Sequence, residues 1–594
     1  MPSTFFGLTI GTSGLYAYQT ALNTTSHNIS NADTKGYSRQ IAKQAASQAI
    51  SVSSKFGMAG TGVDVNSIEQ ERNVYYDMKY WSNNSIYGEY QSKEYYLTAI
   101  EDYFKENNAD GLTTAFDDFY NSLTNLTKDV GNGTIRTQIT NSASSFSKFV
   151  NYLSTSLQRI QEECNSEIKT TVDRVNSIAE QIAAVNKQIN TIEVTGMNAN
   201  DLRDKRALLV DELSTIANIT VEENKVEDGI GISEYTVRID GKVLVDTYNY
   251  NTLECIPKDT KNTQNDIKGL YDIQWSNGQE FNSHSPTLGG SLQAQIEVRD
   301  GNNLEAFKGT ATGTSGTSTI TISDASINDM SKLNIPASDG VIKVGSSLYE
   351  YSSFTATQDP TTKKWEYTFT LKNALSSNVS GSATIGKNVD YKGIPYYESQ
   401  LNEFVRTFAS RFNQLHNEGY DLDGNKGLDF FNGTNPVTGA NFNLNENATT
   451  INGADDTYYQ ITAANFCVTE DILSDPNKIA CASKQNGGIE DKVYLDKLIA
   501  LKTDVSVFKQ GTPSAFLQTL TAEIGIDTKT AQTFTKSQNN ILKAIDAQRM
   551  SVSGVDSDEE AMNLVKFQNA YNLSAKVIQV MDEIYDKLIN QMGV

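Results

Sequence analysis

Apolar residues recur at every seventh position near the start of the chain: Leu8, Leu15, Leu22 and Ile29. This spacing is typical of the narrow seam of a coiled coil rather than of a helix that is buried on all sides. A helix with one apolar stripe is marginal in water by itself, so this segment requires a partner helix. The polar stretch HNISNADTKGYSRQ then breaks the helix, because Asn, Asp, Ser and Gly favour turns.

The end of the chain carries a matching stripe. Apart from one polar position at Ser574, apolar residues alternate there in steps of three and four: Leu564, Phe567, Tyr571, Ile578, Met581, Tyr585, Leu588 and Met592. The acids in SGVDSDEEAMN precede this stripe and suit the positive end of a helix dipole. We therefore predict that the two terminal helices pair. The alternative is that each stripe packs on the core of its own domain.

A second helical system follows the first break. Apolar residues keep a helical spacing from Ile135 to Ile192 with no Gly or Pro between them, which predicts one helix of about 87 Å at about 1.5 Å per residue. The segment TGMNAN ends this helix. DLRDKRALLVDELSTIA then predicts a shorter helix that returns alongside it as an antiparallel hairpin.

From Ile219 onward the pattern changes to strands. EYTVRIDGKVLVD predicts a β-hairpin that turns at Asp240-Gly241. A short helix over GGSLQAQIEVRD follows, and residues 309–392 then predict an inserted β domain, because strand-like runs follow a Gly/Thr/Ser-rich stretch. Because that stretch borders the insertion, we expect the insertion to be dispensable for assembly. A long helix begins near Pro395, and a mixed segment over about 421–502 precedes the helical C-terminal part.

These elements predict a multidomain α+β fold, since 594 residues exceed what one hydrophobic core organises. It combines terminal helices paired as a coiled coil, a long α-helical hairpin or bundle domain, and outer β-rich domains. The expected domains are four: 1–65 with 555–594 as the inner terminal-helix domain; 66–218 with 395–420 and 503–554 as a helical rod; 219–308 with 421–502 as a mixed β-containing domain; and 309–392 as the inserted β domain.

Charge narrows the range of partners. The chain has a net charge of -23 and a pI near 4.7, which argues against nucleic acid and membrane surfaces as partners. The four cysteines are scattered, so we expect neither a zinc site nor a disulfide framework, but buried small side chains. The N-terminus shows no secretory signal peptide and no window suits a bilayer span. The chain is thus expected to stay in the cytoplasm or to leave by a route that does not read such a signal.

Catalytic patterns are sparse. The chain has three histidines and no HExxH, GxSxG or P-loop, so we expect no enzyme and no cofactor. Asp421, Asp423 and Asn425 are spaced as in an EF-hand, but Lys426 stands where that loop needs Gly and Asn432 where it needs Glu. We therefore expect a turn and no metal site.

The opening stretch resembles a known signature. ALNTTSHNISNADTKGYSRQ is similar to the N-terminal signature of the axial proteins of the bacterial flagellum, with these matching positions: Asn28, Asn31, Thr34, Gly36, Tyr37 and Arg39. GMAGTGVDVNSIEQERNVYYD, NANDLRDKRALLVDELS, ITAANFCVTEDILSDPNKIACAS and the C-terminal SVSGVDSDEEAMNLVKFQNAYNLSAKVIQVMDEIYDKLI narrow the resemblance to the hook-associated protein 1 family. The matching segments span most of the chain apart from about 309–392, where the family usually runs straight into the next helix.

The resemblance implies a structural subunit of the junction between the hook and the filament, secreted by the flagellar type III route into the extracellular flagellum. Its implied partners are copies of itself in a ring or tube, the hook protein, the second hook-associated junction protein and an export chaperone. The two apolar seams would form the assembly interface. Two alternatives stay open: another axial subunit, such as the filament protein or the second junction protein, which should lack the NANDLRDKRALLV hairpin, or an axial scaffold that carries an adhesive inserted domain.

Overall fold

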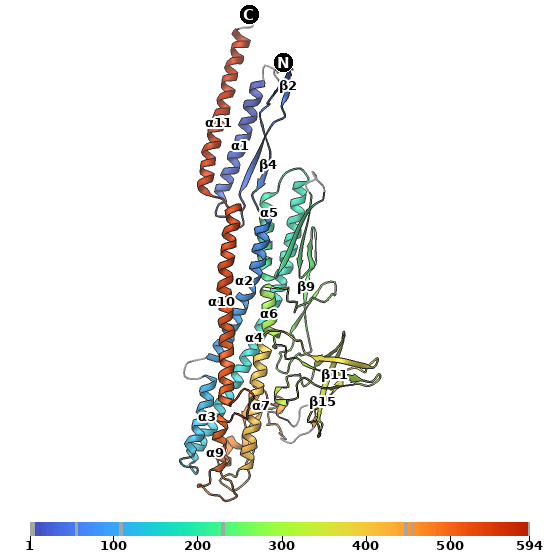
Figure 1. Ribbon diagram of the computed structural model, residues 1–594, viewed down its shortest axis with the longest axis vertical. Helices are drawn as coiled ribbons and strands as arrows, with labels where there is room; N and C mark the ends of the chain where they lie inside the picture. Colours follow the sequence, from blue (N-terminus) through green and yellow to red (C-terminus); the bar gives the residue numbers. More distant parts are fainter. Residues whose placement is uncertain are drawn as a thin grey trace.

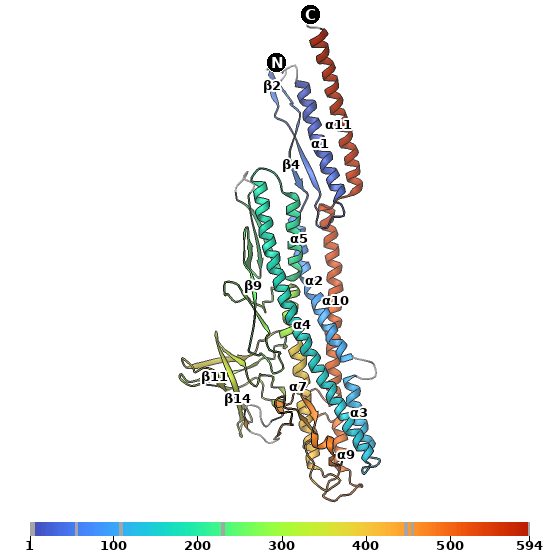
Figure 2. The ribbon, with the colours of Figure 1, turned by 180° about the vertical axis from the view of Figure 1, so that it is seen from behind.

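The computed structural model describes residues 6–53, 57–105, 111–226, 232–444, 450–452 and 457–591. These residues form a long rod with a β-rich lobe on one side (Figure 1). Helix α1 begins and helix α11 ends at the same end of the rod. The view from behind shows the same division into a terminal unit, a helical rod and a side lobe (Figure 2).

The terminal unit combines both ends of the chain. Its helices are α1 (Phe6–Ser30) and α11 (Ser557–Asp586), which continues into the π-helical turn η5 (Lys587–Gln591). Two antiparallel strand pairs complete the unit: β1 (Gln40–Ala46) with β4 (Val63–Gln70), and β2 (Ile50–Ser53) with β3 (Gly57–Ala59).

Long helices form the rod: α2 (Val74–Lys105), α3 (Leu112–Leu126), α4 (Gly133–Glu193), α5 (Asn200–Ile216), α6 (Gly290–Asp300), α7 (Ile394–Glu418) and α10 (Pro513–Ser553). Short helical segments lie at its base and beside the lobe: η1 (Met330–Lys332), η2 (Tyr458–Gln460), α8 (Glu470–Ser474), η3 (Pro476–Lys478), α9 (Val493–Ala500) and η4 (Leu501–Thr503). The uninterrupted helix predicted from Ile135 to Ile192 is confirmed by α4, which has 61 residues. The Asn132 side chain caps its start by accepting the N–H groups of Thr134 and Ile135.

Two small sheets cover the upper rod. The first comprises β5 (Ile219–Lys225), β6 (Ser233–Ile239), β7 (Lys242–Asp246) and β8 (Asn249–Tyr250), and the second pairs β9 (Leu253–Pro257) with β10 (Tyr271–Trp275). The predicted hairpin is confirmed by β6 and β7. Asp240 and Gly241 take φ angles of 47° and 73° at its turn, as a two-residue type I′ connection requires.

The side lobe is a closed barrel of antiparallel strands: β11 (Phe307–Gly313), β12 (Thr319–Ser323), β13 (Gly340–Val344), β14 (Ser347–Gln358), β15 (Trp365–Leu371) and β16 (Val379–Ile385). The strands pair in the order β13–β16–β11–β12–β15–β14, and β14 pairs with β13 to close the ring. Closure leaves few free strand edges, which protects a β module from edge-to-edge association. Strand β18 (Thr450–Asn452) adds to β14, while β17 (Phe431–Gly433) pairs with β19 (Phe466–Val468) at the base of the rod.

The barrel is attached to the rod by more than its two chain connections. Arg406 of α7 is 1 % exposed and donates hydrogen bonds to the carbonyl oxygens of Ser331 and Leu333 in the barrel. Tyr459 belongs to the hydrophobic core of the barrel, and its hydroxyl donates to the carbonyl of Ile335. This attachment argues against the expectation that the insertion is dispensable, because its removal would break contacts that the rod residues make.

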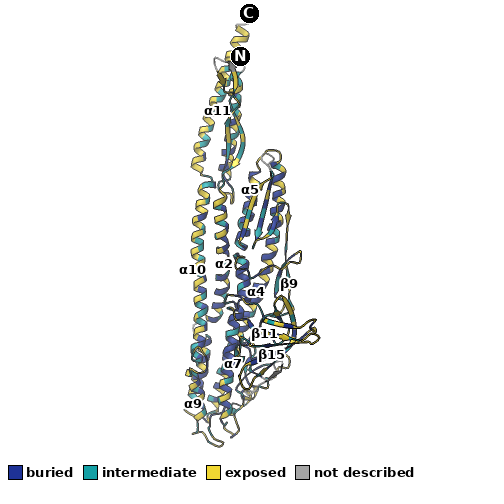
Figure 3. Cartoon of the chain, turned by 45° about the vertical axis from the view of Figure 1, so that its right-hand side comes forward, coloured by how far each residue is buried: buried dark blue, intermediate teal, exposed yellow. Residues whose placement is uncertain are grey.

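Three hydrophobic cores are separate in space: one at the base of the rod, one between α4, α5, α6 and the upper sheets, and one inside the barrel. Figure 3 shows many buried residues in the lower rod, while α11 and the upper part of α10 are mostly exposed. The four cysteines are unpaired: Cys164 and Cys481 are buried, as expected, whereas Cys255 and Cys467 are half-buried. The chain is a multidomain α+β protein, as predicted. The coiled-coil geometry of the terminal helices and the domain boundaries stay predictions.

Candidate assembly interface

Helices α1 and α11 lie antiparallel and in contact (Figure 1). The contact follows small residues on α1, of which Gly11 and Gly14 are buried. A β-carbon at Gly11 would lie 2.9 Å from Ile578 Cγ1, and one at Gly14 would lie 2.9 Å from Ser574 Oγ. Because these distances are shorter than van der Waals contact, a larger residue at either position would have to displace the facing side chain, and glycine lets the two helices approach this closely.

The predicted seam of α11 forms the less exposed face of that helix. Its half-buried members are Leu564, Phe567, Tyr571, Ser574, Ile578 and Met581. Tyr585 is 9 % exposed, whereas Leu588 is 44 % exposed in the π-helical turn. Met592 lies outside the described residues. Met581 lies against Gly7, so this face packs on α1, but its role in assembly stays a prediction.

The predicted seam of α1 lies beside the contact with α11 and not at its centre. Leu8, Leu15 and Leu22 are half-buried, and Ile29 is 39 % exposed. The buried residues of α1 are small or polar: Gly11, Gly14, Ala17, Ala21, Thr24, Thr25 and Asn28. The pattern of apolar side chains could not predict this contact, because the residues of α1 that form it have little or no side chain. The spacing by four and three of Gly7, Gly11 and Gly14 is the signal that finds it, because such positions share one helix face.

A second apolar stripe runs along α11 and ends in η5 at Leu588, which the sequence also placed in the seam. This stripe is exposed, and we call it the outer stripe. Its residues are spaced by four and three and are between 43 % and 66 % exposed: Leu573, Val577, Val580, Ile584 and Leu588. An apolar stripe on a surface helix normally faces a core or a partner. The outer stripe is therefore a candidate contact surface for another molecule.

The signature segment after α1 folds into a tight loop around the buried side chain of Asn28. Asn28 Nδ2 donates to the carbonyl of Gln40 at 2.8 Å, and Asn28 Oδ1 accepts the N–H of Gln40 at 3.0 Å. The Tyr37 hydroxyl donates to the same Oδ1 at 2.8 Å. Burial, reinforced by nearby carboxylates, raises the pKa of Tyr37, so this hydroxyl keeps its proton. Three hydrogen bonds thus close the chain between the end of α1 and the start of β1.

Three further signature residues shape the loop itself. Asn31 Nδ2 donates to the carbonyl of His27 at 3.0 Å, which binds an oxygen at the end of α1. The Thr34 hydroxyl donates to Asn31 Oδ1 at 3.3 Å. Gly36 has a φ of 80°, a left-handed conformation that favours glycine. These residues terminate the helix and reverse the chain.

Arg39, the last signature residue, connects the two ends of the chain. Its Nε donates to Glu560 Oε1 at 2.7 Å and its Nη2 to Glu559 Oε1 at 2.6 Å. Its Nη1 lies 3.5 Å from Glu71 Oε2, and its backbone N–H donates to the carbonyl of Ser553 at 2.8 Å. The first turn of α11 and the last residue of α10 are therefore held at the point where the N-terminal segment leaves α1.

Two more arginines hold the start of α2 at the same level of the rod. Asp77 accepts from Arg72 Nε at 2.7 Å and forms an ion pair of 2.7 Å with Arg549 Nε. Arg549 also donates to Asp211, which accepts from the indole Nε1 of Trp81 at 2.6 Å. These contacts join α2, α5 and α10. We call the ion pairs of Arg39, Arg72 and Arg549 the joint, because they lie where the terminal unit meets the rod.

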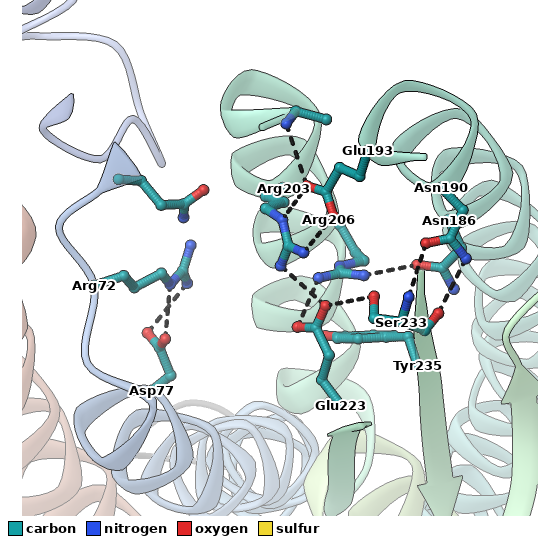
Figure 4. A network of polar contacts seen from close by, with 12 residues as sticks. Arg72, Asp77, Asn186, Asn190, Glu193, Arg203, Arg206, Glu223, Ser233 and Tyr235 are labelled. Atoms are coloured by element: carbon teal, nitrogen blue, oxygen red, sulfur yellow. Dashed lines mark hydrogen bonds and ion pairs between the residues drawn. The ribbon is translucent and has the colours of Figure 1, made fainter. Parts of the chain in front are cut away.

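A second polar network lies beside the joint (Figure 4). Arg203 makes two hydrogen bonds of 2.7 Å with the two oxygens of Glu193 and one of 2.9 Å with Glu223. Arg206 donates to Glu223 at 3.0 Å, and its guanidinium lies 3.7 Å from the centre of the Tyr235 ring. The arginines lower the pKa of Glu223, although burial opposes this shift, so the carboxylate stays charged.

Arg72 and Asp77 face this network in Figure 4, and a cavity of about 470 Å³ lies between them and the network. Both sides of the cavity carry guanidinium groups that are matched with carboxylates, as low-dielectric surroundings require. Such matched pairs hold α2, α5 and the upper sheet in position.

His416 belongs to a residue type that often acts in catalysis, but both of its ring nitrogens form hydrogen bonds with the backbone. His416 Nε2 accepts the N–H of Ala480 at 2.8 Å, so its Nδ1 donates to the carbonyl of Leu428 at 2.6 Å. Burial lowers the pKa of His416 to about 4, which keeps the ring neutral. Within the described residues, no cluster of three or more His, Cys, Asp or Glu side chains is placed to hold a metal ion.

The EF-hand-like stretch forms a turn. Asp421 Oδ1 accepts the N–H groups of Asp423 and Asn425 at 2.9 Å and 2.8 Å, and Gly424 has a φ of 79°. These are the hydrogen bonds of an Asx turn. None of the helices that the structure describes is long and apolar enough to span a membrane.

Comparisons with known proteins agree with the resemblance seen in the sequence. The model of the flagellar hook-associated protein FlgK helical domain matches residues 97–311 and 315–431. A model described as flagella basal body rod protein matches residues 8–37, and one described as flagellar basal body rod FlgEFG protein C-terminal matches residues 546–592. The last two matches fall on α1 with its signature segment and on α11.

Two curated relatives, each matched over its full length, give the same result. Flagellar hook-associated protein 1 of Bacillus subtilis strain 168 is 28 % identical over 606 residues, covering 100 % of this chain and 99 % of the relative. The protein of that name from Escherichia coli strain K12 is 25 % identical over 605 residues, covering 97 % and 98 %. The solved structure of the flagellar hook junction protein FlgK from Burkholderia pseudomallei covers 80 % of this chain and 100 % of its own, with 13 % identity and a TM-score of 0.45.

The relatives are structural flagellar proteins, which confirms the expectation that this chain is not an enzyme. The helical-domain match alone spans more than half of the chain. The chain belongs to the flagellar hook-associated protein FlgK family.

Proposed function

We propose that this chain is a structural subunit of the junction between the flagellar hook and the filament, and that it assembles through α1 and α11. Its partners are further copies of itself in a ring or tube, the hook protein and the second hook-associated junction protein. Export with a chaperone through the flagellar secretion apparatus would bring it to the extracellular flagellum. The family match supports an axial structural role, and the names of the relatives support the place next to the hook.

The outer stripe carries this proposal. Helix α11 already packs on α1 through its seam, and Val577 of the outer stripe borders that contact beside Gly11. The remaining residues of the outer stripe are available to a second molecule. Leu8, Leu15 and Leu22 add a half-buried apolar row on α1. Paired helices with apolar surface on their outside suit repeated contact between copies in a tube.

The joint supports the same proposal. Arg39 fixes the first turn of α11 to the segment that follows α1, so both helices leave the rod in a defined direction. A repeating assembly requires every copy to present its contact surface in the same orientation. The alternative of a filament subunit or second junction protein is less well supported, because the family model matches the region of the central hairpin.

The experiment is a charge placed on the outer stripe. Val580→Asp puts a carboxylate at a position that is 46 % exposed in the single chain, so the variant should fold and be exported. Burial of an unpaired carboxylate between copies is unfavourable, so we expect hooks without filaments. Asn572→Asp is the matched control, because it adds the same charge at an exposed position almost opposite the seam of α11 and should leave filaments intact.

Electron microscopy of flagella and immunoblots of the culture medium give the readout. Normal filaments on cells with Val580→Asp would contradict the proposal. Loss of filaments from Val580→Asp and Asn572→Asp alike would also contradict it, because the effect would then not depend on the outer stripe.

A further inference from the structure

A crevice of about 360 Å³ lies between the barrel and the rod, away from the terminal unit. Its walls are one face of α7, the segment η1, the start of β15, the segment η2 with the residue before it, and residues 507–509. A concave site of this size suits a small ligand better than a flat protein surface does.

The charge of the crevice is opposite to that of the chain. The protein carries a net charge of -23, yet the described lining holds four cations and only two carboxylates, Asp329 and Glu403. Lys332 Nζ lies 2.9 Å from Glu403 Oε1, so these two charges neutralise each other. Arg411 and Lys509 are exposed at the crevice.

Arg406 adds a buried charge at the back of the crevice. Its five N–H groups all donate to neutral acceptors: the carbonyl oxygens of Ser331, Leu333, Tyr459 and Ile461, and the side-chain oxygen of Gln264. Burial lowers the pKa of Arg406 to about 10, which still leaves it charged at neutral pH. The carboxylates of Asp329 and Glu403 oppose this effect of burial. Because Lys332 already pairs with Glu403, the charges of Arg406, Arg411 and Lys509 together exceed that of Asp329, so the crevice favours a further anion.

The remaining walls are aromatic and hydroxyl-bearing. Trp365 and Phe508 line the crevice and are 9 % and 5 % exposed. The Oγ1 of Thr457 is buried and has no hydrogen-bond partner among the residues that the structure describes, and Thr457 as a whole is 7 % exposed. A complementary ligand therefore combines a negative charge, a face that packs on an aromatic ring, and a polar group for Thr457.

We propose that this crevice binds an acidic saccharide, with its carboxylate held by Arg411 and Lys509, its ring against Trp365 and one of its hydroxyls bonded to Thr457. Sugar rings present C–H faces that pack on indoles, and hydroxyls that pair with threonine. This binding site goes beyond the proposed junction function and does not depend on assembly.

Isothermal titration of the full chain with D-galacturonate tests the proposal. D-galactose tests the sugar without its charge, while acetate and inorganic phosphate test the charge without the sugar. We expect galacturonate to bind at least about tenfold more tightly than each of the other three, since removal of a charged hydrogen-bond partner has an effect of this size. Trigalacturonate shows whether the natural ligand is a polysaccharide or a free sugar. Tighter binding than galacturonate indicates a polysaccharide, and equal binding indicates the free sugar.

Variants locate the site. Arg411→Gln and Lys509→Gln remove exposed charges, so the fold should persist, and each should weaken galacturonate binding about tenfold. Lys484→Gln removes an exposed lysine that does not line the crevice and should leave binding unchanged.

Several results would overturn the proposal: no heat at 20-fold molar excess of about 1 mM protein, equal affinity for galactose or phosphate, or equal binding by wild type and Lys509→Gln. Asp455 and Asp456 precede Thr457 in the sequence and lie outside the described residues, so their neutralised double variant is included. Binding by that variant alone would also overturn the proposal, because the chain's own carboxylates would then be what the crevice holds.

Discussion

Glu398 shows how a single buried group ties stability to pH. It is 1 % exposed, and neither carboxyl oxygen has a hydrogen-bond partner among the described residues. Burial, with the nearby Asp266, raises the pKa of Glu398 well above its usual value. The folded chain thus keeps this proton at pH values where the unfolded chain has lost it. Stability is therefore lost as the pH rises from the unfolded pKa of 4.5 toward the raised value.

Glu398→Gln should remove this loss, because the amide carries no proton to release. We expect the variant to melt at a higher temperature than wild type at pH 8, by a margin of a few degrees or about 1–3 kcal/mol, and the margin should shrink at pH 5. Calorimetry at both pH values measures it, with the exposed Glu254→Gln as control. A margin that is the same at both pH values would show that Glu398 is charged in the folded chain.

Among the helices, the contact between α1 and α11 depends on residues that have little or no side chain. Gly14 lies against Ser574, whose hydroxyl donates to the carbonyl of Ala570 at 3.0 Å. A methyl group at position 14 would lie 2.9 Å from Ser574 Oγ but 3.7 Å from Ser574 Cβ. The hydroxyl alone therefore prevents an alanine from fitting.

The double-mutant cycle of Gly14→Ala and Ser574→Ala should be strongly non-additive. Gly14→Ala alone should destabilise the pair of helices, because the serine must move. With Ser574→Ala the methyl group fits, and the double variant should gain up to about 1 kcal/mol from the higher helix propensity of alanine. Hydrogen exchange of α11 amides in the monomer measures each variant. Additive effects would mean that these two helices do not touch in solution at this position.

At the scale of the whole molecule, the barrel should contribute to the stability of the rod. Phe307 and Ile385 are paired residues at its entry and exit, so a short Gly-Ser linker can replace residues 308–384 without strain. The deletion nevertheless removes two acceptors of Arg406 and uncovers Tyr459. We expect a melting temperature several degrees lower, since each lost buried partner has an effect of about 1–3 kcal/mol.

A matched control inserts the same linker into the exposed turn at residues 360–362, where no melting change is expected. Calorimetry of both proteins shows whether the barrel stabilises the rod. An unchanged melting temperature after the deletion would show that the barrel does not stabilise the rod.

The local pattern of the sequence predicted many helices, strands and turns of this molecule. Contacts between residues far apart in the chain could not be predicted in this way. Helix α4, the hairpin at Asp240 and the turn at Asp421 follow from periodicity and turn chemistry, which act over a few residues. Arg39 could be singled out by its motif, but its partner Glu560 lies 521 positions away and depends on how both chain ends meet. The hydrogen bonds by which Arg406 attaches the barrel to the rod could not be predicted from the sequence for the same reason.

Copies of this chain should meet through the paired terminal helices if the proposed function is right. An electron cryomicroscopy reconstruction of the assembled junction tests it most directly, because it shows which surface of each copy is covered by the next. We expect the outer stripe, from Leu573 to Leu588, to be buried against α1 or α11 of a neighbouring copy, with Val580 at the contact. A reconstruction in which the outer stripe faces solvent, and copies touch only through the rod or the barrel, would contradict it.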